Sequence, residues 1–180
     1  MDINFVFETI NKNLSARGVD ILMIGGHAVN YYGYIRATMD VDFMIASEAI
    51  SLVRDQMKAA GFTNISEGEN VIFFNHPKSS IRVDFLSVDT GTMATLLQHA
   101  VVTDYGGFSV KVPSLLDLIS MKLFSLRNPK REERDMMDIV QLVLENKLDV
   151  ASSLKPLCDR FSTNTIYQKL KKRIEEERDA

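Results

Sequence analysis

Residues 21–43 read ILMIGGHAVNYYGYIRATMDVDF, and this stretch decides the fold. Its first four residues, 21–24, form a fully apolar run that predicts a buried strand. The pair Gly25-Gly26 permits a sharp turn and a close approach of the backbone to a ligand, and residues 27–33 predict a short helix. An ordinary strand-to-helix turn has the same pattern, so the glycine pair alone is a weak signal.

A second predicted strand, residues 40–45, begins with two acids. Side chains alternate along a strand, so Asp40 and Asp42 share one face, with their Cα atoms roughly 7 Å apart. Neighbouring carboxylates repel each other unless a cation lies between them, and oxygen ligands of this kind suit Mg²⁺ or Mn²⁺. A solvated strand face is the alternative interpretation.

A third acid, Asp84, lies within a predicted strand at 81–86 that alternates apolar and charged residues. An acid inside such a strand is costly unless it is paired or ligated. Its partner is therefore either a metal ion shared with the two acids of strand 40–45, or a salt bridge with Arg36 or Arg82.

The rest of the chain separates into two parts. Periodicity predicts helices at 4–17, 47–60 and 91–99, a strand at 71–75, a hairpin of 101–103 and 109–112, and, after Pro113, only helices at 114–126, 131–146, 149–160 and 163–178. We therefore expect an α+β fold, with a small mixed β-sheet flanked by helices over residues 1–112. A C-terminal helical lobe follows at 113–180, with no clear linker between them.

A strand, a glycine pair, two acids on one face and a third acid on a later strand are more specific together than any one of them. In this combination the chain resembles the nucleotidyltransferases of the DNA polymerase β superfamily. The matching residues are Ile24-Gly25-Gly26, then, after thirteen residues, Asp40-Val41-Asp42, and finally Asp84.

A closer resemblance rests on the stretch Arg36-Ala37-Thr38-Met39-Asp40-Val41-Asp42-Phe43. It looks like the Arg-x-Thr-x-Asp-hydrophobic-Asp signature of the AbiEii-like branch, which includes bacterial toxin-type nucleotidyltransferases. That branch also carries a Lys and an Asp about 13 residues apart in the helical lobe, and Lys122 and Asp135 match them. The resemblance covers about residues 20–145.

The resemblance implies a metal-dependent enzyme that transfers a nucleoside monophosphate from an NTP such as ATP to an acceptor hydroxyl or phosphate, with release of pyrophosphate. The two-metal chemistry of phosphoryl transfer fits these residue types. The resemblance implies that Asp40, Asp42 and Asp84 bind metal and that Asp84 also takes the acceptor's proton. It implies that the triphosphate is bound by Gly25, Gly26, Arg36 and Lys122. Thr38 would fix the loop before Asp40, and Asp135 would orient Lys122 or bind the acceptor.

Several of these residues also have a purely structural interpretation. Lys122 can lie along the apolar stripe of its helix, and Asp135 can form a surface pair with Arg134. Asp138, one turn further on, is an alternative functional acid. Arg36 can pair with Asp84 when no metal is bound. His27 and the three tyrosines at 31, 32 and 34 are more typical of packing than of ligand binding.

Composition limits the setting and the partners. The 180 residues are 46% hydrophobic and 25% charged, as in an ordinary globular chain. The single cysteine, the lack of a signal-peptide pattern and the lack of a membrane-length apolar run predict a reducing, cytoplasmic setting with no membrane partner. The net charge of −3 argues against non-specific coating of nucleic acid.

The acceptor stays open at the level of sequence: RNA, a protein side chain or a small molecule are the candidates, and a toxin role would add a cognate antitoxin. Residues 121–134 carry five basic residues against two acids, a local excess suited to steering a triphosphate or a nucleic-acid end. The alternatives are a non-catalytic domain of the same fold that binds a nucleotide or a partner, and a small antibiotic-type nucleotidyltransferase.

Overall fold

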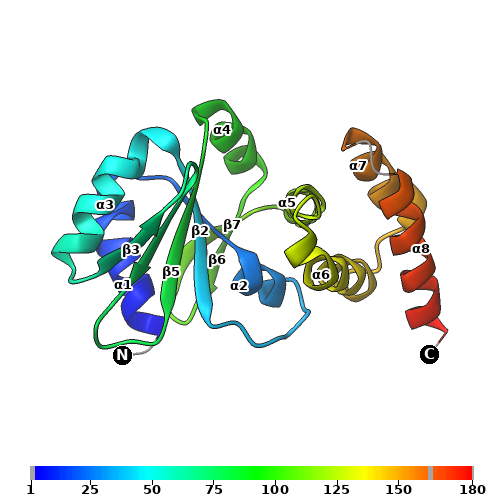
Figure 1. The fold of residues 1–180 in the computed structure, drawn as a ribbon, viewed down its shortest axis with the longest axis horizontal. Helices are drawn as coiled ribbons and strands as arrows, with labels where there is room; N and C mark the ends of the chain where they lie inside the picture. Colours follow the sequence, from blue (N-terminus) through cyan, green and yellow to red (C-terminus); the bar gives the residue numbers. More distant parts are fainter. Residues whose placement is uncertain (1–2, 162–163, 180) are drawn as a thin grey trace. The chain divides into compact units, whose positions relative to one another are not determined.

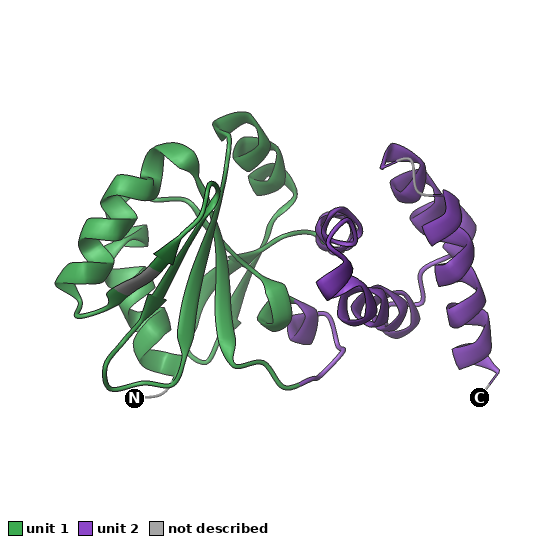
Figure 2. Ribbon diagram, in the orientation of Figure 1, with its two compact units in different colours: residues 1–28, 37–114 green, residues 29–36, 115–180 purple. Residues whose placement is uncertain are grey.

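The structure, a computed structural model, describes residues 3–161 and 164–179 and divides into two compact units. The sheet unit comprises residues 1–28 and 37–114, and the helical unit comprises residues 29–36 and 115–180 (Figure 2). The sequence places the boundary after residue 112 and assigns residues 29–36 to the first part. In the structure this segment groups with the helices, because Asn146 Nδ2 donates to the carbonyl of Tyr32 at 2.9 Å and Arg36 pairs with Asp138.

The sheet unit is built on five strands in the order β1-β2-β5-β4-β3. Figure 1 labels β2, β5 and β3 of this sheet. Strands β2 and β5 are parallel and all other neighbours are antiparallel, so the sheet is mixed. The strands are β1 (Ile21–Ile24), β2 (Asp40–Ala46), β3 (Thr63–Glu67), β4 (Val71–Asn75) and β5 (Arg82–Val88).

Helices and a separate hairpin complete the sheet unit. They are α1 (Ile3–Asn13), the first turn of α2 (Gly25–Tyr31), α3 (Ile50–Ala59), α4 (Thr90–His99), the 3₁₀ turns η1 (Ser15–Arg17) and η2 (Ser47–Ala49), and the hairpin strands β6 (Val101–Tyr105) and β7 (Phe108–Val112). Aromatic rings join α1 to the sheet: Phe7 lies 6.0 Å from Phe43, which stacks on Phe85 at 5.5 Å. These residues are fully buried, so the acids that alternate with them point to the other face of the sheet.

The helical unit consists of α5 (Leu115–Ser125), η3 (Pro129–Arg131), α6 (Glu132–Glu145), a π-helical turn η4 (Val150–Leu154), α7 (Lys155–Arg160) and α8 (Asn164–Arg178). Its core is apolar, with Leu118, Ile139 and Leu170 fully or almost fully buried. No helix in the described residues has both the length and the apolar character needed to cross a bilayer.

The structure confirms the α+β class, and three elements differ from the sequence prediction. Strand β3 was not predicted, because Thr63–Glu67 has no clear apolar alternation. The helix predicted at 149–160 divides into η4 and α7, because Pro156 has no N–H and its ring opposes a regular helix before it. The short helix after β1 begins at Gly25 rather than at residue 27.

Two predicted helix ends differ from the structure or lie at the edge of the described residues. The first helix was predicted to run to residue 17 and stop at Gly18, but α1 ends at Asn13, and Gly18, with a left-handed φ of 78°, ends the 3₁₀ turn η1. The last helix was predicted to begin at residue 163, which lies outside the described residues; α8 runs over Asn164–Arg178.

Candidate active site

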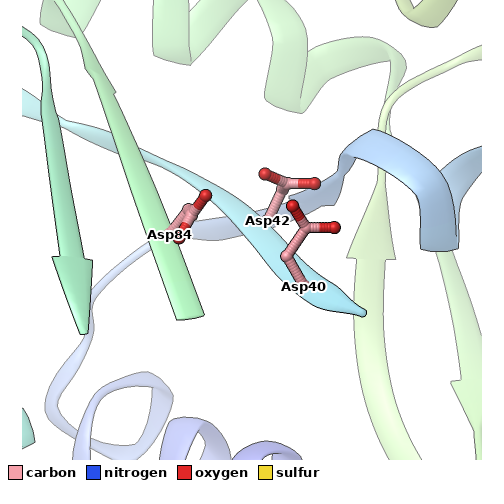
Figure 3. Close-up of side chains that lie close together, drawn as sticks. All are labelled: Asp40, Asp42 and Asp84. Carbon is pink, nitrogen blue, oxygen red and sulfur yellow. The ribbon is translucent and has the colours of Figure 1, made fainter. Parts of the chain in front are cut away.

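Three carboxylates converge on one face of the sheet, at the start of two parallel strands (Figure 3). Asp40 and Asp42 come from β2 and Asp84 from β5, and the register pairs Asp42 with Asp84. Each acid offers one oxygen, and the three oxygens lie within 4.8 Å of one another. Asp84 is buried, whereas the two acids of β2 are partly exposed, so the cluster is open to solvent on one side.

Arg82 supplies the positive charge beside these acids. Its guanidinium donates two hydrogen bonds to Asp84, both at 2.7 Å, and one to Asp40 at 3.0 Å. The hydrogen bond to Asp84, together with the charges of the acids, raises the pKa of Arg82. Among the ion pairs that the structure describes within the sheet unit, one guanidinium faces three carboxylates, a formal excess of two negative charges. An all-oxygen donor set with that excess fits a hard divalent cation such as Mg²⁺ or Mn²⁺.

Gly25 lies directly against Asp42. It has a left-handed φ of +64°, and a Cβ built on it would lie 1.9 Å from Asp42 Oδ2 and 2.8 Å from Asp42 Cβ. Rotation of the Asp42 carboxylate would not relieve the contact with Asp42 Cβ, because the backbone of β2 fixes the position of that atom. The first glycine of the pair is therefore required by the packing of a candidate metal ligand against the turn from β1 to α2.

Thr38 holds the beginning of β2. Its hydroxyl donates to Asp40 Oδ1 at 3.0 Å and lies 3.2 Å from the Asp40 carbonyl oxygen. It thereby restricts the side chain of Asp40 before any ligand arrives.

His27 makes a packing contact within the sheet unit. Its Nδ1 lies 2.6 Å from the hydroxyl of Tyr105, and Phe7 lies edge-on to its ring. Burial raises the pKa of Tyr105, so this hydroxyl stays protonated and is available as a donor. The contact joins the first turn of α2 to the β6–β7 hairpin.

Three further sequence-predicted site residues, Arg36, Lys122 and Asp135, come together in the helical unit, in a buried ionic network. Lys122 Nζ lies 2.8 Å from Asp135 and 2.7 Å from Asp138, and Arg36 binds Asp138 through two hydrogen bonds of 2.7 and 2.9 Å. Ser125 also donates to Asp135. Two cations and two anions balance in this network, and Lys122, Asp135 and Asp138 are almost fully buried.

The pKa shifts in this network follow its geometry. Burial acts to raise the pKa of Asp135, but the charge and hydrogen bond of Lys122 outweigh it and hold the pKa below its usual value. Burial likewise acts to lower the pKa of Arg36, and Asp138 outweighs it and raises that pKa. Both groups are therefore charged at neutral pH.

The contacts within each unit bear on the pairings considered from sequence. Arg36 pairs with Asp138 in the helical unit, and Asp84 pairs with Arg82 in the sheet unit, which is one of the two partners expected for it. Asp135 pairs with Lys122 rather than with its neighbour Arg134. The Arg82 contact had a signal in the sequence, because residues two apart on a strand share a face.

The tyrosines of residues 31–34 lie in the helical unit, and two of them pack on each other. The rings of Tyr31 and Tyr32 meet edge-on at 4.9 Å. Burial and the nearby Tyr31 and Asp117 raise the pKa of Tyr32 to about 12.

Comparison with known families now identifies the class of protein. Residues 6–176 match the model of a family described as nucleotidyl transferases of unknown function (DUF2204), and the chain belongs to this family. Comparison with functionally curated proteins gave no significant match.

Solved structures show the same fold at low sequence identity. The antibiotic-resistance factor ANT(2'')-Ia is 14% identical with a TM-score of 0.68, over 98% of this chain and 100% of that one. The lincosamide antibiotic adenylyltransferase LnuA, bound to lincomycin, is 13% identical with a TM-score of 0.58, over 79% and 96%. An antigenic nucleotidyltransferase-like protein from Paracoccidioides brasiliensis is 18% identical with a TM-score of 0.58, over 92% of each chain.

Proposed function

We propose that the chain is a divalent-metal-dependent nucleotidyltransferase that transfers a nucleoside monophosphate from an NTP to an acceptor hydroxyl or phosphate. The observation that carries this proposal is the convergence of Asp40, Asp42 and Asp84 within 4.8 Å on two parallel strands of a nucleotidyl transferase family member.

In this reaction an acceptor oxygen forms a bond to the α-phosphorus of the NTP. The bond from that phosphorus to the bridging oxygen breaks, and pyrophosphate leaves with the electron pair. Divalent ions bound to the three acids would neutralise the phosphate charge that opposes the attack. In this proposal Asp84, the most buried of the three acids, would take the proton of the acceptor hydroxyl.

The other residues have supporting roles in this proposal. Thr38 orients Asp40, Gly25 makes room for Asp42, and Arg82 offsets part of the negative charge of the acids in the metal-free protein. Binding of the triphosphate by the amides of Gly25 and Gly26 stays a prediction of the resemblance. We assign Lys122 and Asp135 to the buried network of the helical unit rather than to phosphate or acceptor, because the ammonium group already contacts two carboxylates.

The first test is nucleotide binding, measured as a thermal shift with MgCl₂ and each non-hydrolysable NTP. We expect a rise in melting temperature for at least one nucleotide, and its loss in Asp40→Asn/Asp42→Asn. Asp55→Asn/Glu69→Gln is the matched control, because it removes two carboxylates from exposed positions of the same unit. Equal shifts in both double variants would overturn the metal assignment.

The second test is chemistry. Mg²⁺-dependent release of pyrophosphate in the presence of candidate acceptors should disappear in Asp84→Asn. Acceptor screening also separates an RNA or protein acceptor from a small molecule, the class of substrate named for the antibiotic adenylyltransferase of the same fold. A toxin role with an antitoxin stays a prediction of the resemblance to the AbiEii-like branch.

A further inference from the structure

The turn that joins α5 to α6 concentrates exposed positive charge beside an exposed aromatic ring. We call it the basic turn and define it by Phe124, Arg127, Lys130, Arg131 and Arg134, all of which are exposed. Phe124 is 55% exposed, an unusual position for a phenylalanine side chain. The whole surface lies in the helical unit.

The acids within this turn are neutralised by α8. Glu132 binds Lys169 at 3.1 Å, and Glu133 binds Arg173 through two hydrogen bonds of 2.9 and 3.1 Å. Other lysines of α8 pair with glutamates on their own helix, as Lys171 does with Glu175. Because α8 already pairs with Glu132 and Glu133, these two acids do not offset the positive charge of the basic residues in residues 121–134.

The basic residues of the turn keep most of their charge uncompensated. Within the described part of the chain, no carboxylate forms an ion pair with Arg127, Lys130 or Arg134. Arg131 makes a single long contact, 3.9 Å, to Asp135, which Lys122 already neutralises. Several cations spread over one exposed turn fit a ligand with several phosphates in a row.

The aromatic ring adds a second element of recognition. The guanidinium of Arg127 lies 4.7 Å from the centre of the Phe124 ring, and Phe161 meets the same ring edge-on at 6.3 Å. These two contacts hold the Phe124 ring while 55% of the residue stays exposed, which leaves aromatic surface on which a nucleobase can stack. A base in a duplex is already stacked on both sides, so this feature favours a single strand.

We propose that the basic turn is a docking surface for single-stranded nucleic acid, with phosphates on Arg127, Lys130 and Arg134 and a base on Phe124. This inference rests on the proposed function in one respect: it makes a nucleic-acid end the acceptor of the nucleotidyl transfer. The binding itself requires neither a metal ion nor an NTP.

The test is fluorescence anisotropy with labelled single strands of about 12 nucleotides, as RNA and as DNA, and with a duplex of the same sequence. It is run without divalent ions, over a salt titration. We expect binding of the single strands that weakens as salt rises, and weaker binding of the duplex. Arg127→Gln/Arg134→Gln should lower the slope of log K against log salt by about 1.4, or about 0.7 for each phosphate that is no longer neutralised.

Two comparisons make the result specific. Lys171→Gln/Lys172→Gln removes the same charge from α8 and should leave binding unchanged, because those lysines face their own glutamates. Phe124→Leu should weaken binding of the single strand by roughly 5-fold or more. Phe124→Tyr keeps the aromatic ring and should bind the single strand as the unmodified protein does. Melting temperatures of all variants check that the helical unit stays folded.

The proposal is overturned if the unmodified protein binds no single strand at low salt, if the duplex binds equally well, or if the two charge variants lose binding equally. A protein that binds Mg²⁺-NTP but no single strand overturns the docking surface alone. One that binds the single strand but no NTP supports the docking surface and overturns the proposed function.

Discussion

Gly25 determines how Asp42 is placed, and its replacement provides the sharpest test at the scale of a single residue. Gly25→Ala adds a Cβ 2.8 Å from Asp42 Cβ in a left-handed backbone conformation. We expect it to lower the free energy of unfolding by more than the roughly 1–2 kcal/mol that left-handed backbone alone costs, and to abolish the Mg²⁺-dependent thermal shift. Urea denaturation measures the first effect, and melting curves with and without MgCl₂ in the presence of the non-hydrolysable NTP measure the second.

Gly18→Ala is the control for this change. Gly18 has a φ of +78°, and no atom lies within 4 Å of a Cβ built on it. Alanine at this position therefore adopts the same unfavourable left-handed backbone conformation, but its Cβ clashes with no other atom. It should keep the Mg²⁺-dependent shift. If the two variants behave alike, the close packing of Gly25 on Asp42 has no role in metal binding.

The proposed metal site predicts that Arg82 and a divalent ion compete for the same carboxylates. Arg82→Gln should destabilise the metal-free protein by about 1–2 kcal/mol, the lower part of the range for hydrogen bonds to charged groups, because the side chain is 44% exposed. Arg82→Gln should also increase the stabilisation of the protein by Mn²⁺, because the ion no longer has to displace the Arg82 guanidinium from the carboxylates. Melting curves at increasing MnCl₂ concentration measure this.

Arg54→Gln breaks an exposed pair with Glu67 in the same unit and serves as the comparison. Its Mn²⁺ response should match that of the unmodified protein. A smaller Mn²⁺ response in Arg82→Gln would mean that Arg82 assists the ion rather than competing with it.

At the residue level, sequence reasoning succeeds where contacts are local and fails where they are distant. Alternation along a strand is enough to put Asp40 and Asp42 on one face. The partner of Arg36 lies 102 residues away in α6, and no periodicity links the two positions. Lys122 and Asp135 were matched by spacing, but their burial was not accessible from the sequence, because it depends on how α5 and α6 pack.

The elements show the same contrast. Strands at 40–45 and 81–86 follow from their apolar alternation, but their parallel pairing and the register that sets Asp42 beside Asp84 are tertiary facts. Strand β3, an edge strand with polar residues, carries too weak a pattern to be predicted.

The buried network that links α5 and α6 gives a prediction at this scale. Lys122→Met keeps the shape of the side chain but leaves two buried carboxylates with Arg36 as their main counter-charge. We expect a loss of about 3–5 kcal/mol of unfolding free energy, the usual cost of breaking a buried ion pair. Urea denaturation followed by circular dichroism at neutral pH measures it.

Lys155→Met is a matched control, because Lys155 pairs with Asp159 at the same 2.8 Å but at the exposed surface of α7. Exposed helix pairs are screened by solvent and contribute little to stability, so the loss in Lys155→Met should be much smaller. Similar losses in the two variants would show that burial adds nothing to the network.

At the scale of the whole molecule, the residues expected in one site divide between two units. Asp40, Asp42 and Asp84 belong to the sheet unit, whereas Arg36, Lys122 and Asp135 belong to the helical unit. The resemblance treats all six as one functional set. Within the sheet unit the contacts describe a candidate metal site, and within the helical unit they describe a buried ionic network.

This division predicts where a divalent ion alone should stabilise the protein. A divalent ion bound to the three acids would stabilise the sheet unit by about 2.7 kcal/mol when its concentration is 100 times its dissociation constant. This stabilisation would slow amide exchange in the sheet unit by up to about 100-fold. We expect Mn²⁺ to protect peptides from β2 and β5 and to leave peptides from α6 and α8 unchanged, in hydrogen exchange followed by mass spectrometry. Protection should vanish in Asp40→Asn/Asp42→Asn, and protection concentrated in α6 and α8 would place the ion in the helical unit and contradict the assignment.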